Sequence, residues 1–203
     1  MNNIIIRLEE EKDYSTVEEL TREAFWKKER IAKLGVGCTE HYMVHSLRKK
    51  YGIMELNFVA EVNGKIVGHV IYSKASILQP NSEKKEVLNF GPLSVLPEYQ
   101  KQGIGSALMK HSIECAKKLG YGAILFLGHP TYYPRFGFVE AKEFGITTAS
   151  GENFPAFMAM ELKTGYLNGV SGRYFEATIY NDEKNKELAK EYDKKFYNNT
   201  NSL

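Results

Sequence analysis

The chain has 203 residues, of which 43% are hydrophobic and 26% are charged, a composition that indicates an ordinary globular protein with a sizeable core. Its 27 basic and 25 acidic side chains give a formal net charge of +2, which argues against nucleic-acid binding because that function needs a concentrated basic face. The two cysteines, Cys38 and Cys115, have no metal-ligand spacing, and no stretch approaches the ~18 apolar residues of a membrane span, so we expect a cytoplasmic protein without metal, nucleic-acid or membrane partners.

The N-terminal part predicts a strand followed by two helices. Residues 4–8 read as a short strand, and the acidic residues that follow are not typical of a signal peptide. Residues 15–18 (STVE) have the S-x-x-E form of a capping box, which predicts the start of a helix at Ser15. After a break at Gly35 and Gly37, a second helix is expected to begin near Thr39.

The middle of the chain changes to a strand pattern. Asn63-Gly64 stands between two apolar runs, which is the strongest short signal for a β-hairpin. A polar loop then precedes a third apolar run. The expected strands cover residues 58–62, residues 66–72 with a continuation as far as Leu78, and residues 87–96.

A strand–helix–strand unit follows. A glycine-containing turn at residues 100–105 leads into a helix that we expect to end near Leu119, and Gly120 stands where a helix-terminating glycine belongs. Residues 123–127 form a short apolar run. A strand, a helix and a strand joined by one crossover predict a parallel pair of strands.

The C-terminal part becomes polar from Ser171 onward. Residues 157–162 are expected to be the last strand. Leu188, Tyr192 and Phe196 recur every four residues, which predicts an amphipathic helix. We therefore expect a domain over residues 1–165 and a C-terminal extension over residues 166–203.

The turn before the predicted helix is suited to a phosphate group. The first N–H groups of a helix have no partner within it, and the helix dipole favours negative charge there. Gly103 and Gly105 lack a Cβ, so the backbone can approach an anion closely. The segment lacks the Gly-Lys-Ser/Thr of a P-loop, and Leu108 stands where a Rossmann fingerprint needs its third glycine. A glycine turn that only shapes the connection, or that binds another nucleotide, remains an alternative.

The longer string identifies a family. Residues 97–108 (PEYQKQGIGSAL) closely resemble the acetyl-CoA motif Q/R-x-x-G-x-G/A of the GNAT superfamily, the GCN5-related N-acetyltransferases. The resemblance implies a mixed α/β fold, with a mostly antiparallel sheet, one splayed parallel strand pair and flanking helices. It implies acetyl-CoA as cosubstrate, with backbone amides near Gln102 to Ser106 on the coenzyme A pyrophosphate. The cofactor-binding residues expected in this turn are Gln100, Lys101, Gln102, Gly103, Ile104, Gly105 and Ser106.

The strand before the turn contains Gly91 and Pro92. Proline donates no ladder hydrogen bond and glycine often marks a bulge, so a regular ladder is not expected there. An edge strand would show the same residues. The family resemblance implies instead that pantetheine enters a gap beside this strand, where Leu93 and Val95, with Ser94 between them, offer main-chain groups to pantetheine and to the acetyl carbonyl, as a small oxyanion hole.

Residues 128–138 (GHPTYYPRFGF) resemble the family's second motif, in a bacterial form that reads G-x-P-x-Y-Y-x-R-F-G-F. The resemblance implies that Tyr133 protonates the departing thiolate. A phenol titrates near 10 and a thiol near 8.5, so a tyrosine in a dry site can serve as the acid. Tyr132 is the alternative acid, and a purely structural role for Tyr133 also remains open.

The general base is less well defined by the sequence. The candidates are Glu61, His69, Glu86 and His129, and an ordered water is an equal alternative. His129 is close to Tyr133 in sequence, and histidine as a residue type suits proton transfer, so it is taken as the catalytic partner. The resemblance places the acceptor beside the helices of residues 15–50, where Trp26 and Tyr42 are candidates for the pocket wall.

The sequence thus predicts an N-acetyltransferase that transfers an acetyl group from acetyl-CoA to a primary amine of a small molecule or peptide by direct attack. Two alternatives remain: a transferase that uses another acyl-CoA, and a non-catalytic protein that binds coenzyme A as a sensor or interaction module. A homodimer is compatible with the family resemblance.

Overall fold

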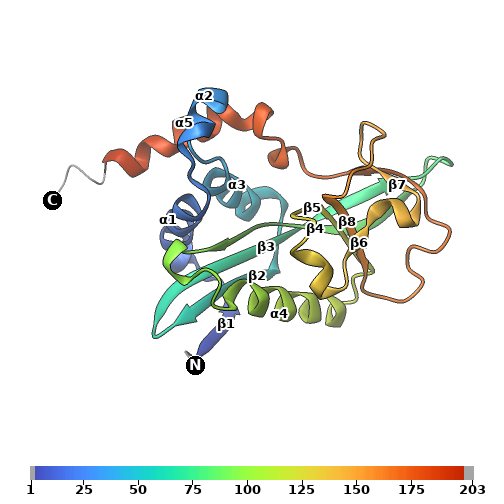
Figure 1. Cartoon of the computed structure of the whole chain (residues 1–203), viewed down its shortest axis with the longest axis horizontal. Coiled ribbons are helices and arrows are strands. Elements are labelled where there is room, and N and C mark those ends of the chain that lie inside the picture. Colours follow the sequence, from blue (N-terminus) through green and yellow to red (C-terminus); the bar gives the residue numbers. More distant parts are fainter. Residues whose placement is uncertain (1–2, 199–203) are drawn as a thin grey trace. The chain divides into compact units, whose positions relative to one another are not determined.

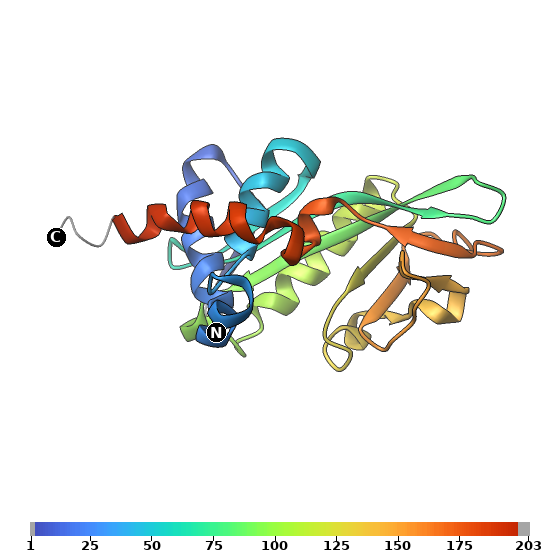
Figure 2. The ribbon, with the colours of Figure 1, turned by 90° about the horizontal axis from the view of Figure 1, so that it is seen from above.

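The computed structural model describes residues 3–198, which form two compact units. Strands β3 (Lys65–Leu78) and β4 (Lys84–Val95) and helix α4 (Ile104–Lys118) run through both units (Figures 1 and 2). Of the described residues, the first unit comprises 3–71, 92–108 and 178–198, and the second comprises Tyr72–Gly91 and Met109–Ala177.

The first unit combines strands with most of the helices. Besides its parts of β3, β4 and α4, it contains β1 (Ile4–Leu8), η1 (Glu11–Asp13), α1 (Tyr14–Phe25), α2 (Lys28–Leu34), α3 (Glu40–Ser46), the π-helical turn η2 (Leu47–Tyr51), β2 (Gly52–Val62), η3 (Pro97–Tyr99), η6 (Thr178–Tyr180) and α5 (Asp182–Asn198).

The second unit is built mainly of short strands. Besides its parts of β3, β4 and α4, it contains β5 (Ala123–Leu127), η4 (Tyr133–Phe136), β6 (Val139–Glu140), η5 (Ala141–Phe144), β7 (Ile146–Thr147), β8 (Phe157–Glu161) and β9 (Gly172–Phe175).

The strands form a sheet in the order β1-β2-β3-β4-β5-β8-β6, with β9 on β3 and β7 on β9. The pairs β1/β2, β3/β9, β5/β8 and β6/β8 are antiparallel. β4 and β5 are parallel, in register at Leu88 and Ile124, and β7 and β9 add a two-residue parallel ladder. The predicted fold class, a mostly antiparallel sheet with a parallel pair and flanking helices, is therefore confirmed.

The predicted β-hairpin is confirmed. Asn63 and Gly64 have φ angles of 51° and 77°, the left-handed conformation that a two-residue hairpin turn requires and that asparagine and glycine adopt at low cost. The two strands that flank this turn, β2 and β3, extend beyond the apolar runs that predicted them.

The predicted capping box at Ser15 is wrong. α1 begins at Tyr14, so Ser15 lies inside the helix, and the reciprocal cap is made earlier by Glu10 and Asp13. Glu18, the expected capping partner, is instead buried and accepts hydrogen bonds from Arg48 and Lys195. A pattern as short as S-x-x-E also occurs where there is no cap, and here its glutamate forms tertiary ion pairs instead.

Several elements were not predicted, among them α2, β9 and the two-residue strands β6 and β7. α2 occupies the segment before the expected break and ends at Gly35, whose φ is 74°. β9 follows β8, so the expectation that residues 157–162 form the last strand is wrong. β9 has little strand signal because Tyr174 is its one buried residue, and Gly172 permits an approach to the Leu78 carbonyl that a Cβ would block.

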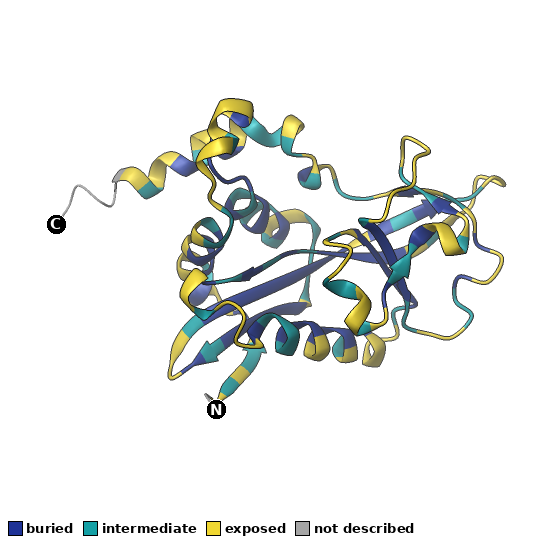
Figure 3. Cartoon of the chain, in the orientation of Figure 1, coloured by how far each residue is buried: buried dark blue, intermediate teal, exposed yellow. Residues whose placement is uncertain are grey.

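Apolar clusters hold each unit together (Figure 3). In the first unit, Val17 of α1, Val44 of α3 and Val59 of β2 pack together. Helix α5, which lies on α2 and α3 (Figure 2), buries Ala189 against Leu34 and Val36. A helix is thus present in the predicted C-terminal extension, of which residues 199–203 lie outside the described part of the chain.

The buried stripe of α5 differs from the predicted one. Leu188 is 55% exposed, whereas Asp193 is buried and forms an ion pair with Arg22 of α1, with Nε and Oδ1 separated by 2.6 Å. Tyr192 and Phe196 stack on the ring of His41, as predicted for an inward face. The exact stripe could not be read from apolar residues because one of its members is an aspartate paired with another helix.

In the second unit, twelve buried residues form one continuous cluster that includes Leu125, Phe157 and Tyr174. This cluster joins β3, β4, β5, β8 and β9 and supports the parallel pair from one side. Among residues 3–198, no helix has the length and apolar composition of a membrane-spanning segment.

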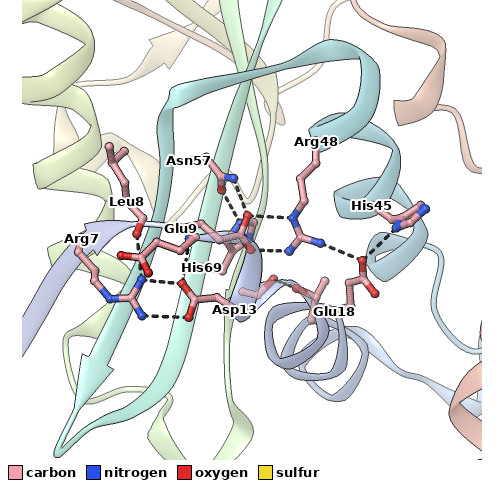
Figure 4. Close-up of polar contacts among 12 residues, drawn as sticks. Arg7, Leu8, Glu9, Asp13, Glu18, His45, Arg48, Asn57 and His69 are labelled. Carbon is pink, nitrogen blue, oxygen red and sulfur yellow. Dashed lines mark hydrogen bonds and ion pairs between the residues drawn. The ribbon is translucent and has the colours of Figure 1, made fainter.

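A buried polar network links β1, β2 and the first helices (Figure 4). Arg48 donates two hydrogen bonds to Glu9 and one of 2.8 Å to Glu18. Glu9 also accepts from the Asn57 amide at 2.5 Å, and Asn57 Oδ1 lies 2.7 Å from His69 Nε2. Because the side chain of Arg48 is 4% exposed, these carboxylates offset the cost of burying its charge.

We expect Arg48→Met to lower the free energy of unfolding by about 3–5 kcal/mol, because it keeps the aliphatic stem but removes the cation that Glu9 and Glu18 share. Urea denaturation measures the loss. Lys117→Met, which removes the exposed partner of Glu114, serves as the control and is expected to change stability by no more than about 0.5 kcal/mol. Equal effects of the two substitutions would contradict the role given to Arg48.

Candidate functional site

The connection from β4 to α4 forms the predicted glycine turn. Leu96 ends the strand by donating to the Val67 carbonyl of β3 at 3.0 Å, and the turn η3 follows. Lys101 and Gly103 have φ angles of 60° and 89°, so the chain twice adopts the left-handed conformation before the helix. A Cβ at Gly103 would meet no atom within 4 Å, which means that this side of the turn is open to a ligand.

Helix α4 presents its N-terminus at this turn. The first helical hydrogen bond runs from the Ala107 N–H to the Gly103 carbonyl at 2.9 Å, so the N–H groups of Ile104 and Gly105 precede the helical ladder. Gln102 is exposed and steadies the turn by donating from its side chain to the Glu98 carbonyl at 2.8 Å. Backbone N–H groups and the helix dipole together favour an anion here.

The predicted cofactor-binding residues of this turn differ in exposure. Ile104 is 2% exposed, so its side chain anchors the helix and only its backbone is available to a ligand. Gly105 and Ser106 are half-buried. Gln100, Lys101, Gln102 and Gly103 are exposed. The geometry thus favours binding by main-chain groups.

The main chain of β4 alternates in direction before the turn. Because Leu96 donates to β3, Ser94 also directs its N–H and C=O toward β3, while Leu93 and Val95 direct theirs away from it. The hydroxyl of Ser94 is buried 3.0 Å from that of Thr21. The Val95 carbonyl accepts a hydrogen bond from the Gln100 side chain at 3.1 Å. Of these three predicted residues, Leu93 and Val95 direct their main-chain groups away from β3, and their role in binding pantetheine stays a prediction.

In the second unit, Tyr133 packs into an aromatic cluster. Its ring lies 4.6 Å from that of Phe126, 5.6 Å from that of Phe90 and 6.0 Å from that of Phe138. Burial in this apolar surrounding raises the pKa of the Tyr133 phenol above its ordinary range. A Cβ at Gly128 would overlap both Tyr133 and Phe126, which explains the glycine at the start of the motif.

Tyr132 and His129, the neighbours of Tyr133 in the motif, are less enclosed. Arg135 lies over the ring of Tyr132, 4.6 Å from its centroid. His129 is exposed, and its Nδ1 lies 3.0 Å from the Thr131 hydroxyl while its carbonyl accepts from the Tyr132 N–H. These contacts order the turn, and the catalytic role predicted for His129 stays a prediction.

The other predicted bases are occupied by structural contacts. Glu61 forms an ion pair with Arg7 in the first unit. His69 is fully buried beside Asn57 and Arg48, and burial together with the Arg48 charge lowers its pKa well below the ordinary value. Glu86 is exposed and lies 2.9 Å from Lys74 Nζ.

A fifth ionisable group near β4 was missed by the sequence analysis. Glu176 Oε2 accepts a hydrogen bond of 2.7 Å from the Asn89 amide of β4 and lies 3.3 Å from the Tyr174 hydroxyl. Burial raises the pKa of Glu176 to about 7, although its two neutral hydrogen-bonding partners oppose the shift. No local pattern marks Glu176, because its environment comes from a strand that lies 87 residues earlier.

The candidate acceptor residues lie in the first unit. Trp26 is 40% exposed and packs over Gly37, where a Cβ would overlap the indole ring. Tyr42 lines a cavity of about 370 Å³ together with Lys49, Lys50, Tyr51 and Leu188. Tyr42 therefore does border a cavity, while Trp26 is not among the residues that line it.

Comparison with known proteins shows which family the chain resembles. A family model described as an acetyltransferase (GNAT) domain matches residues 55–140. The chain is 29% identical to the uncharacterised N-acetyltransferase YhbS of Escherichia coli K12, over 83% of this chain and 93% of that protein. It is 39% identical to the uncharacterised N-acetyltransferase YjhQ of the same organism over 41% of this chain, a match that spans 45% of YjhQ.

Solved structures agree with these relatives. The crystal structure of Escherichia coli YhbS in complex with CoA superimposes with a TM-score of 0.76 at 26% identity, covering 89% of this chain and 93% of that one. A GNAT family acetyltransferase from Brucella melitensis, in complex with acetyl-CoA, has the same fold, with a TM-score of 0.66 at 24% identity over 89% of this chain and 100% of that one. The chain is thus similar, in sequence and in fold, to N-acetyltransferases of the GNAT superfamily.

The environment of Tyr133 predicts its titration. Because burial raises the pKa of Tyr133, its phenol is expected to remain neutral at a pH one unit above the ordinary tyrosine pKa of about 10. Hydrogen bonds from Thr178 and Lys50 lower the pKa of Tyr51 instead, so Tyr51 is expected to ionise first. NMR of ¹³C-labelled tyrosine measures both, with Tyr133→Phe and Tyr51→Phe to assign the signals. Titration of Tyr133 near 10 would contradict the buried environment.

Proposed function

We propose that this protein is an acetyl-CoA-dependent N-acetyltransferase that transfers the acetyl group to a primary amine of a small molecule or peptide by direct attack. The observation that carries the proposal is the open glycine turn at the N-terminus of α4, which directly follows Leu93 and Val95 with their main-chain groups facing away from β3. The relatives named as N-acetyltransferases and the CoA in the YhbS structure support it.

Coenzyme A binding would rely on main-chain groups. The N–H groups between Gln102 and Ser106, at the start of α4, would hold the diphosphate, because a helix N-terminus supplies both donors and a favourable dipole. The pantetheine arm would extend beside Leu93 and Val95, and the Gln100 amide would release the Val95 carbonyl when the arm bonds there. A main-chain N–H of this strand would polarise the thioester carbonyl as an oxyanion hole.

Tyr133 would act as the general acid. A neutral phenol is the form that can protonate the departing thiolate, and burial keeps Tyr133 in that form. Its ring is held in place by Phe90, Phe126 and Phe138, so the hydroxyl has a defined position. Such preorganisation is what a proton donor at a single leaving atom requires.

The surroundings of the two cysteines favour direct attack by the amine over a covalent intermediate on a cysteine. Burial is the main cause that raises the pKa of the Cys38 thiol far above its ordinary value, with Glu40 adding to the shift, so Cys38 remains a thiol. Cys115 lies within α4, well after the turn that would bind the diphosphate. Neither is placed as a thiolate nucleophile, which would need an electropositive and accessible site.

Coenzyme A binding can be tested at one glycine. Acetyl-CoA at 100 times its Kd is expected to stabilise the wild type by about 2.7 kcal/mol in a thermal-shift assay, and ATP is not. Gly103→Ala should weaken acetyl-CoA binding at least tenfold, since the new Cβ stands on the open side of the turn.

Gly64→Ala is the matched control for this test. Gly64 has a φ of 77° and equally open surroundings, so alanine strains the backbone similarly there, in a hairpin remote in sequence. The control should lose a similar amount of stability and bind acetyl-CoA like the wild type. Equal affinities of the two variants would show that the turn does not hold the coenzyme.

The acid can be tested by removing one oxygen. Tyr133→Phe keeps the aromatic packing and is expected to lower kcat by about 10²-fold, while the KM for acetyl-CoA stays unchanged. Thiol release with a panel of amino acids, polyamines, aminoglycosides and peptides provides the assay. Unchanged turnover in Tyr133→Phe together with a loss in Tyr132→Phe would move the role to the neighbouring tyrosine.

A further inference from the structure

Glu176 lies beside the point where the parallel strands β4 and β5 of the second unit pair. β4 and β5 are in register at Leu88 and Ile124. Asn89, one residue further along β4, donates to Glu176 at 2.7 Å. Leu125, one residue further along β5, accepts a hydrogen bond of 2.9 Å from the Tyr174 hydroxyl, which also lies 3.3 Å from Glu176. Both strands are therefore tied to the Glu176 carboxylate.

The two side chains that approach Glu176 are both neutral. Asn89 contributes an amide and Tyr174 a phenol, and Tyr174 is the titratable group that faces the carboxylate. Glu176 has no ion-pair partner among the described residues. A half-buried carboxylate without a cation accepts a proton readily. This distinguishes Glu176 from Glu61 and Glu86, which have paired cations.

The same stretch of β4 also contacts the proposed acid. Phe90, next to Asn89, packs its ring 5.6 Å from that of Tyr133. Because successive side chains of a strand point to opposite faces, Asn89 and Phe90 place Glu176 and Tyr133 on different sides of β4. Acetyl transfer removes a proton at nitrogen and delivers one at sulfur, so an acid and a base on different sides suit the two atoms.

We propose that Glu176 is the general base that takes the proton from the acceptor amine, with Asn89 and Tyr174 as the residues that position its carboxylate. This inference rests on the proposed function. It assigns the base to the segment after β9, within the predicted C-terminal extension, rather than to any of the four candidates that the sequence suggested.

The proton balance of the step is complete. The acceptor ammonium gives one proton to the Glu176 carboxylate and becomes a neutral amine. Its nitrogen forms the C–N bond, the C–S bond breaks with its electron pair on sulfur, and the sulfur takes the Tyr133 proton. The second proton lost by nitrogen restores the phenol, and Glu176 releases its proton to solvent. The net result is an amide, free coenzyme A thiol and one released proton.

The first test is a direct titration of the free protein. ¹³C NMR of labelled glutamate carboxyls, with Glu176→Gln to assign the signal, is expected to show a pKa of Glu176 of about 7. A signal titrating near the ordinary value of about 4.3 would overturn the proposal, whatever acceptor the enzyme uses. Should Glu176→Gln not fold, Glu176→Asp assigns the signal while keeping a carboxylate.

The second test is the pH profile of kcat/KM. The wild type is expected to lose activity as pH falls through about 7, because Glu176 is then protonated. Glu176→Gln should lower kcat by about 10²-fold, abolish this acid limb and leave the KM for acetyl-CoA unchanged. Glu114→Gln, which alters an exposed glutamate of α4, is the control and should keep the wild-type profile. An acid limb that persists in Glu176→Gln would overturn the proposal.

The positioning role has its own readout. The hydrogen bond from Asn89 favours the charged carboxylate, so Asn89→Ala is expected to shift the acid limb to higher pH. A loss of activity without a shift would mean that Asn89 is only structural. If acetyl-CoA does not stabilise the wild type and no amine releases thiol, the proposed function fails; if the wild type is active while Glu176→Gln retains its profile, only the present inference fails.

Discussion

A residue of β4 directs its N–H and its C=O to the same side of the strand, and this geometry determines which main-chain groups a ligand can reach. Leu96 bonds to Val67 of β3, which commits Ser94 to β3 as well and turns Leu93 and Val95 away from it. Gly91, with a φ of 142°, and Pro92 interrupt the regular strand just before. The donors and acceptors proposed for a pantetheine arm are therefore backbone groups whose direction follows from the pairing of one neighbouring strand.

The turn that follows β4 extends the same principle to the diphosphate. The positive φ angles of Lys101 and Gly103 bring the chain round so that α4 begins with its N–H groups not yet used by the helix. Side chains contribute mainly by holding the turn, as Gln102 does at the Glu98 carbonyl. A site made of backbone groups needs few specific side chains, which is why a short glycine pattern can identify it across proteins of low identity.

The proposed proton-transfer groups obtain their properties from burial rather than from charged neighbours. Tyr133 is enclosed by Phe90, Phe126 and Phe138, and Glu176 is held by an amide and a phenol. Desolvation shifts both pKa values upward, which keeps the acid protonated and brings the base close to neutrality. The ion pairs of the chain, such as that between Arg48 and Glu9, serve stability instead.

The sequence by itself determined the features that depend on neighbouring residues. The Asn63-Gly64 hairpin, the glycine turn before α4, the strand over 123–127 and the resemblance to the GNAT family all follow from local patterns, and the structure has these elements. Only the tertiary structure decided which ionisable groups are paired and which are buried without a charge. The local pattern around Glu18 predicted a helix cap, but Glu18 bonds to Arg48 instead. No local sequence pattern marks Glu176, because its partner Asn89 is distant in the chain. Protonation behaviour depends on surroundings that distant segments create, whereas turns and helix ends depend on the backbone preferences of a few adjacent residues.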